Sequence, residues 1–200
     1  GYQSLTANTS GSNNTGVGYR TLYTVSGAGT DNSAVGYVAL CSVTTGDGNV
    51  GMGYAAGNAV TTGSDNTLLG RDSGRSSSPF TVTTQSNRIV LGNDSVTNAY
   101  IQVAWTVTSD LRDKTEIEDV PHGLDFVDKL KPVSFKFKKS REDDTPTGTK
   151  HYGFLAQDIL ELEGDNNVII DNEQPEKLKY KGEHLVPVLV NAIKELSETN

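Results

Sequence analysis

The sequence predicts two structural parts in one chain, a β-solenoid followed by a small α+β domain with a long C-terminal helix. Three observations support this division. Residues 1–108 repeat at a nearly fixed period and hold 16 of the 21 glycines. Residues 109–200 hold 20 of the 25 acidic residues, so nearly all of the net charge of −8 lies there. The last segment has the apolar spacing of a helix. We therefore expect two domains, 1–108 and 109–200.

The first half repeats a Gly-Tyr-x-x-Leu phrase or a variant of it. Copies start at Gly1, Gly18, Gly36, Gly53 and Gly70, which are 17 or 18 residues apart, and an asparagine lies four residues before each of the last four. Residues 87–92 form a last, altered copy after an insertion. A fixed period with glycine and asparagine at set positions is typical of a stacked solenoid.

Each period is expected to form one coil of two short strands. Valine and leucine would lie inside, and glycine or asparagine would occupy corners that need a positive φ. A disordered Gly/Ser/Thr-rich linker is the alternative, but a linker has no reason to keep its apolar residues in register. Residues 75–108 are expected to be a transition with strands at 81–83 and 100–105. We interpret Trp105, the only tryptophan, as a packing residue near the junction.

Few residues of the chain have the pattern of a metal site. Asp31, Asp47 and Asp65 lie one or two residues before a repeat asparagine, where carboxylates serve calcium binding and corner turns equally well. Cys41 is the only cysteine, and the three histidines are far apart in the sequence. We therefore expect neither a metal nor another cofactor.

The charged half has a mixed pattern. It predicts a helix at 124–130, an alternating strand at 133–138, an exposed loop at 139–150, a returning strand at 151–155, a helix at 156–162 and a turn at 164–166. The strongest helix covers 184–198, with Pro187 in its first turn. Its residues with coiled-coil spacing are Leu185, Leu189, Ala192 and Leu196, and Val188 and Ile193 widen this stripe. The stripe suits a trimeric bundle or the core of its own domain.

The segment 109–114 holds the candidate reactive residues. A serine hydroxyl is a weak nucleophile that needs a nearby base, and Lys114 is a candidate base for Ser109 if partial burial keeps its amine neutral. Residues five positions apart do not face each other on a regular helix. Ser109 must therefore precede a helix in an extended or turn conformation, with Lys114 folding back. The alternative is a helix N-cap followed by a solvated lysine.

Four motifs in order carry a resemblance to a known family. They are Thr108-Ser109-Asp110-x-Arg112-x-Lys114-x-x-Ile117, Leu130-Lys131-Pro132-Val133-x-Phe135, the run 153–158 and the run 185–196. Together they resemble the C-terminal intramolecular chaperone domain of phage tail fibres, tailspikes and endosialidases, a self-cleaving peptidase. The repeat half resembles the head repeats of trimeric autotransporter adhesins, which are left-handed β-rolls, and similar repeats of phage tail fibres.

This resemblance implies that three chains assemble through the second domain, which helps the β-rich stalk to fold and then cuts the Thr108–Ser109 bond. Ser109 would be the nucleophile and Lys114 the general base of this serine peptidase. Asp110, as a cap, and Gln157, from its motif, are candidate supporting residues. The domain would be released after assembly, which locks the folded fibre kinetically.

The expected protein is the distal part of a phage tail fibre, made in the host cytoplasm and carried on the virion. Its partners would be two copies of itself, upstream fibre segments and a receptor on the host cell surface. The chain begins in mid-repeat, which favours a fragment of a longer polypeptide. The acidic charge argues against nucleic-acid binding, and no apolar run approaches the length of a membrane span.

Two other functions are compatible with the sequence. The first is a non-catalytic trimeric surface adhesin fragment whose C-terminal domain only trimerises. The second is a glycan-degrading fibre, which the repeat half does not favour because it lacks paired carboxylates in a recurring context.

Overall fold

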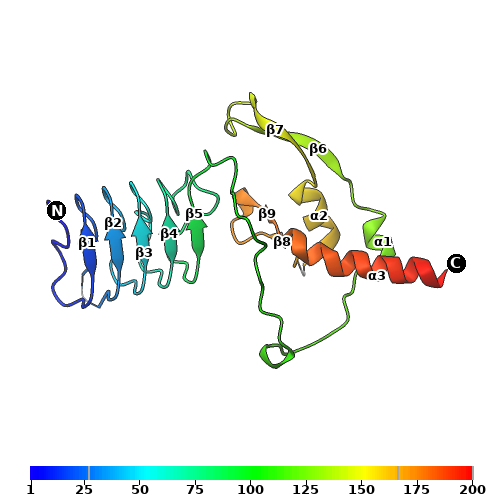
Figure 1. Cartoon of the computed structure of the whole chain (residues 1–200), viewed down its shortest axis with the longest axis horizontal. Coiled ribbons are helices and arrows are strands. Elements are labelled where there is room, and N and C mark those ends of the chain that lie inside the picture. The colour runs from blue at the N-terminus through cyan, green and yellow to red at the C-terminus, as the bar shows by residue number, and fades with distance from the viewer. Residues whose placement is uncertain (27, 166, 200) are drawn as a thin grey trace. The chain divides into compact units, whose positions relative to one another are not determined.

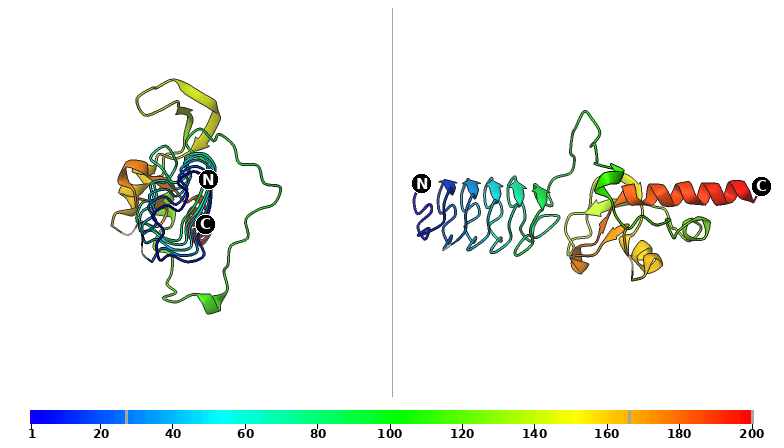
Figure 2. Two further views of the ribbon diagram at one scale, coloured as in Figure 1. Left: turned by 90° about the vertical axis from the view of Figure 1, so that its left-hand side faces the viewer. Right: turned by 90° about the horizontal axis from the view of Figure 1, so that it is seen from below.

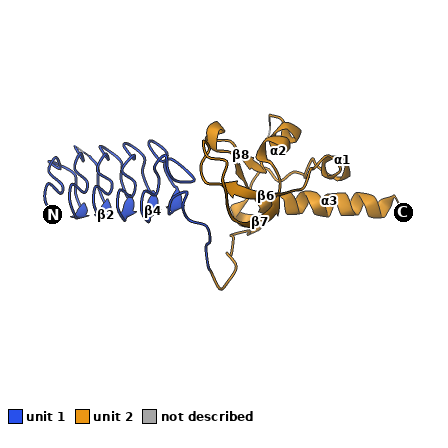
Figure 3. Cartoon of the chain, turned by 90° about the horizontal axis from the view of Figure 1, so that it is seen from above, with its two compact units in different colours: residues 1–100 blue, residues 101–200 orange. Residues whose placement is uncertain are grey.

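The computed structural model describes residues 1–26, 28–165 and 167–199 and divides the chain into two units, Gly1–Tyr100 and Ile101–Asn200 (Figure 3). The first unit is a β-solenoid. The second is a small α+β unit that ends in the helix α3 (Leu185–Glu198). This confirms the fold class predicted for a single chain. The division lies ahead of the Thr108–Ser109 bond.

The solenoid is built around one parallel sheet in chain order (Figure 1). Its strands are β1 (Thr15–Val17), β2 (Ser33–Val35), β3 (Val50–Met52), β4 (Thr67–Leu69) and β5 (Ile89–Leu91). Equivalent residues pair, so that Val17 lies beside Val35 and Val35 beside Met52. The pairing of β5 with β4 confirms that residues 87–92 form a further coil.

Each coil contributes one strand instead of the two that the sequence predicts. The reason lies in the Gly-Tyr-x-x-Leu phrase, whose third and fifth residues have left-handed backbone angles. Arg20 has φ 51° and Leu22 has φ 50°, and Val38 and Leu40 repeat these values closely. A strand cannot contain such angles, so this part of each coil forms consecutive turns.

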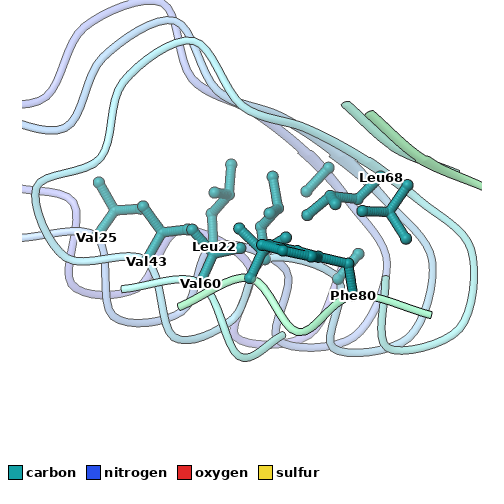
Figure 4. Close-up of a cluster of buried hydrophobic side chains, with 11 residues drawn as sticks. Leu22, Val25, Val43, Val60, Leu68 and Phe80 are labelled. Carbon is teal, nitrogen blue, oxygen red and sulfur yellow. The ribbon is translucent and has the colours of Figure 1, made fainter. Parts of the chain in front are cut away.

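The core of the solenoid consists of apolar side chains that stack from coil to coil (Figure 4). This confirms that valine and leucine occupy the interior at these positions. The strands alternate, so Ala34 is fully buried while its neighbour Val35 is exposed. The labelled members of the stack are Leu22, Val25, Val43, Val60, Leu68 and Phe80, all of them buried.

The repeat asparagines form a buried ladder, so the prediction that they occupy corners is wrong. Asn49 Nδ2 donates to Asn32 Oδ1 at 3.0 Å and to the carbonyl of Gly63 at 2.9 Å. Asn66 repeats this pattern one coil later. The positive φ belongs to the preceding residue, as at Asp65 with 56°. Because the ladder satisfies buried backbone groups, its amides can lie inside the coil.

The three aspartates considered as calcium ligands have structural contacts. Asp31 and Asp65 occupy corners with positive φ. Asp47 Oδ1 accepts hydrogen bonds from Thr30 N at 2.7 Å and from Thr30 Oγ1 at 3.0 Å. Within the described ranges, no group of three or more acidic, histidine or cysteine side chains could hold a metal ion.

One outer surface of the solenoid carries a ladder of tyrosines from the Gly-Tyr pairs. Tyr2, Tyr19, Tyr37 and Tyr54 stack with ring centroids 5.7, 5.1 and 5.2 Å apart and nearly parallel planes. The guanidinium of Arg71 lies over the last ring at 5.6 Å from its centroid. The fixed repeat period thus places aromatic side chains in contact outside the core as well.

The predicted strands of the transition are not formed. Residues 81–83 are irregular, although Val82 is fully buried, and residues 100–105 are also irregular. The prediction that Trp105 packs near the junction is wrong for the single chain, because its side chain is 75% exposed. Neither segment pairs with another strand within the part of the chain that the structure describes.

The second unit combines a long hairpin with helices (Figures 1 and 2). Its strands are β6 (Val133–Lys138), β7 (Pro146–Gly153), β8 (Ile170–Asp171) and β9 (Lys179–Tyr180). Its helices before α3 are α1 (Leu124–Val127) and α2 (Ala156–Glu163), and its 3₁₀ turns are η1 (Leu111–Asp113), η2 (Pro175–Lys177) and η3 (Gly182–His184). The strand predicted at 133–138 and the helices predicted at 156–162 and 184–198 are confirmed.

Two predicted boundaries of this unit are wrong. Residues 146–150 belong to β7 and not to a loop, because they pair with the end of β6, where Pro146 lies beside Lys138. Helix α1 ends at Val127 because Lys129 N and Leu130 N donate to carbonyls three residues back, which tightens the chain into turns. In the turn predicted at 164–166, Gly164 has φ 65°, and Asn166 lies outside the described residues.

Helix α3 presents two apolar faces. Leu185, Val188 and Ala192 are buried in the core of their own unit, together with Phe126 and Ile159. A second set is exposed and consists of Val186, Leu189, Val190, Ile193 and Leu196. The single seam predicted from Leu185, Leu189, Ala192 and Leu196 is therefore wrong, because its members divide between the two faces. None of the described helices is long and apolar enough to cross a membrane.

Candidate active site

Ser109 and Lys114 lie within hydrogen-bonding distance of each other. Lys114 Nζ donates to Ser109 Oγ at 2.7 Å. The 3₁₀ turn η1 lies between them, with Asp113 N donating to Asp110 O at 3.1 Å and Lys114 N to Leu111 O at 3.2 Å. This tight turn reverses the chain within five residues, so the lysine returns to the serine as their spacing requires.

Asp110 caps this turn and binds Arg112. Its Oδ1 accepts from Arg112 N at 2.9 Å and from Arg112 Nε at 3.0 Å, and its Oδ2 accepts from Arg112 Nη2 at 2.6 Å. The side-chain bonds from Arg112, followed by its backbone N–H, lower the pKa of the Asp110 carboxyl below the ordinary 3.8. The carboxylate is therefore ionised at neutral pH and supports the turn as a bidentate clamp.

The site is in water in the single chain. Every residue from 94 to 121, including Thr108, Ser109 and Lys114, is exposed. A lysine acts as a general base through its neutral amine, and desolvation is what favours that form. One chain thus brings the two candidate groups together without supplying the dry environment that the predicted chemistry would require.

The remaining candidate, Gln157, lies at the second position of α2 and is exposed. Among the hydrogen bonds of the described residues, none joins Gln157 to Ser109 or Lys114. The structure therefore brings together two of the candidate side chains, with Asp110 beside them, and leaves Gln157 on a separate element.

Two residues of α3 that the sequence did not single out hold the chain downstream of the site. Asn191 Nδ2 donates to Val120 O at 3.1 Å and to His122 O at 3.3 Å. Glu195 Oε2 accepts from Leu124 N at 2.7 Å and so caps α1, whose own N-cap residue is Gly123. A Cβ atom at Gly123 would collide with the Glu195 carboxylate. These contacts join residues 69 or 71 positions apart, so no local pattern could reveal them.

A stacked solenoid followed by a small α+β unit with a Ser–Lys pair at its start defines a fibre-like protein with a C-terminal accessory domain. Comparison with known families supports this class. Residues 109–169 match the model of a peptidase family described as chaperone of endosialidase. Residues 109–169 are thus similar to the chaperone-of-endosialidase family, and the match supports a chaperone role of the phage tail-fibre type.

The match begins at Ser109, the residue that follows the candidate scissile bond. In general, the proteins of this family are peptidases that cleave their own chain and self-associate into trimeric fibres. No curated protein and no solved structure gave a significant match to this chain.

Proposed function

We propose that the chain is the distal part of a phage tail fibre whose C-terminal domain, residues 109–200, drives trimerisation and folding of the β-rich stalk and then cuts the Thr108–Ser109 bond. The observation that carries this proposal is the hydrogen bond of 2.7 Å between Lys114 Nζ and Ser109 Oγ at the first residue of the family match. The enzyme is then a serine peptidase with a Ser–Lys dyad that acts once on its own chain.

The first chemical step is an N-to-O acyl shift. Lys114 Nζ, as a neutral amine, accepts the proton of the Ser109 hydroxyl, and Oγ attacks the carbonyl carbon of Thr108. Oγ, Cβ, Cα and N of Ser109 close a five-membered ring with that carbon. The bond from the carbon to Ser109 N then breaks, and the nitrogen takes the proton back from Lys114. The product is an ester on Ser109 beside a free amino group.

Water completes the reaction. It attacks the ester carbon, and Lys114 accepts a proton from it and returns one to the departing Ser109 Oγ. The products are a stalk that ends in the Thr108 carboxylate and a free domain that begins with the Ser109 amine. Because the helper is then gone, the assembled stalk is locked kinetically.

Trimerisation supplies the environment that the single chain lacks. The exposed apolar face of α3 offers a contact surface for two further copies. Neighbouring chains would exclude water from Lys114 and favour its neutral amine, which makes cleavage follow assembly. On the virion, the solenoid would lie between upstream fibre segments and a receptor on the host cell surface.

The decisive measurement is the intact mass of the freshly made chain. We expect fragments of 108 and 92 residues from the wild type and whole chains from Ser109→Ala and Lys114→Ala. Lys114→Arg keeps a positive charge but cannot act as a base, so it should also stay whole. Lys150→Ala alters an exposed lysine of β7 outside the four motifs and should cleave normally.

The exposed face of α3 also favours a second function, an adhesin fragment whose C-terminal domain only trimerises. A wild-type chain that stays whole although it is folded and trimeric would support that function and exclude the peptidase.

A further inference from the structure

The segment Ile101–Val107, which leads to the candidate scissile bond, has the side-chain pattern of a strand, and no strand among the described residues pairs with it. Its alternate residues Ile101, Val103, Trp105 and Val107 are 58, 74, 75 and 66% exposed. The residues between them are Gln102, Ala104 and Thr106. This period of two places the large apolar side chains on one face of an extended chain.

The exposed apolar surface of this segment is large for a single chain in water. Four such side chains, with an indole among them, present on the order of 400 Å², as much as the largest patch of a typical soluble monomer. The same backbone also leaves its N–H and C=O groups available to another strand. Both properties indicate a segment that is covered in the assembled protein.

The charge of the segment indicates what covers it. Residues 95–109 contain no charged side chain, in a chain with 25 acidic and 17 basic residues. Identical strands that pair in register place each side chain beside its own copy, so a single charge would face the same charge. A charge-free, alternating strand avoids this repulsion. A second copy of the same segment is therefore the partner that fits it best.

We propose that Ile101–Val107 becomes a β-strand by pairing, parallel and in register, with the same segment of other copies of this chain. Parallel pairing keeps the solenoids of the paired chains on the same side of the strands, as a single fibre requires. This choice of orientation rests on the proposed function. The pairing covers the apolar face and draws the Thr108–Ser109 bond and the dyad from water into the assembly. Strand pairing upstream of the bond thus couples assembly to cleavage.

Trp105 makes the pairing measurable, because it is the only tryptophan of the chain. In the uncleavable Ser109→Ala protein, we expect its fluorescence to move to shorter wavelength as the concentration rises, in step with the assembled mass measured by sedimentation. Val103→Lys places a charge on the apolar face and should abolish this shift. Gln102→Lys, on the opposite face, is the matched control and should retain it. Both positions are exposed in the single chain, so neither change disturbs a core.

The same two substitutions in the cleavable chain test the coupling. Val103→Lys should slow cleavage at least tenfold, and Gln102→Lys should leave it near the wild-type rate. The pairing is overturned if the two variants behave alike or if Trp105 stays exposed in the assembled protein. It is also overturned if the fluorescence shift of Trp105 does not depend on concentration, because the chain would then cover its own segment. Burial of Trp105 in a wild-type chain that is not cleaved would support the pairing and contradict the proposed peptidase activity.

Discussion

The residue on which the geometry of the dyad depends most directly is Asp110. Its carboxylate accepts three hydrogen bonds from Arg112 and thereby closes the turn that returns Lys114 to Ser109. Among the described hydrogen bonds, none joins the Asp110 carboxylate to Ser109 Oγ or Lys114 Nζ, so Asp110 is a candidate positioning residue. Its hydrogen bonds limit the conformations of a short exposed turn.

The charge state of Asp110 gives a prediction about pH. Arg112 lowers the pKa of this carboxyl, so the clamp is complete above the ordinary value of 3.8 and is lost only as the pH falls through the lowered value. An NMR titration of Asp110 in the Ser109→Ala protein should give a midpoint below 3.8. In Arg112→Gln the midpoint should return towards the ordinary value. An unchanged midpoint in that variant would contradict the clamp.

At the scale of elements, the solenoid depends on the asparagine ladder as much as on its apolar stack. Each buried amide joins two coils, since Asn49 bonds to Asn32 on one side and Asn66 on the other. A single ladder residue therefore affects three coils, which is the nearest-neighbour coupling expected of a repeat protein.

Removal of one ladder amide should loosen the neighbouring coils. Asn49→Ala leaves the carbonyl of Gly63 and the amides of Asn66 without their partner, at a cost on the order of 3 kcal/mol. Hydrogen exchange followed by mass spectrometry should show faster exchange in the coils around β3 and β4. Asn98→Ala, at an exposed position outside the sheet, should leave these rates unchanged. Equal protection in both variants would show that the ladder contributes little.

Helix α3 has one apolar face in the core of its own unit and one exposed apolar face, and we expect the exposed face to serve assembly. Ile193→Glu places a charge on the exposed face, so it should weaken trimer formation at least tenfold while the helical circular dichroism signal persists. Lys194→Glu changes the charge at the adjacent exposed position and serves as the control. Sedimentation over a concentration series measures both. If the Ile193→Glu protein still forms trimers, the trimer interface lies on another surface of the chain.

At the scale of the whole molecule, the exposure of the dyad predicts that cleavage depends on association. A single chain leaves Lys114 in water, so dilution should slow cleavage even though the reaction lies within one sequence segment. The test is the rate of fragment formation by mass over a hundredfold range of chain concentration. A rate that stays constant while the protein dissociates would show that one chain is a sufficient catalyst.

The local sequence pattern predicted much of the structure of this chain. The period of 17 or 18 residues predicted the solenoid, and the alternation of 133–138 predicted β6, because stacking and pairing repeat the same local contacts at a fixed spacing. The spacing of Ser109 and Lys114 likewise required a turn, and η1 provides one.

Residue spacing along the chain was enough to predict the solenoid class, the helices α2 and α3 and the segment in which Lys114 returns to Ser109. Only the folded chain shows that the asparagines lie inside, that α3 has two apolar faces and that Asn191 and Glu195 anchor residues 120–124. These features depend on which distant groups satisfy buried donors and acceptors, and such partners are fixed only when the chain folds.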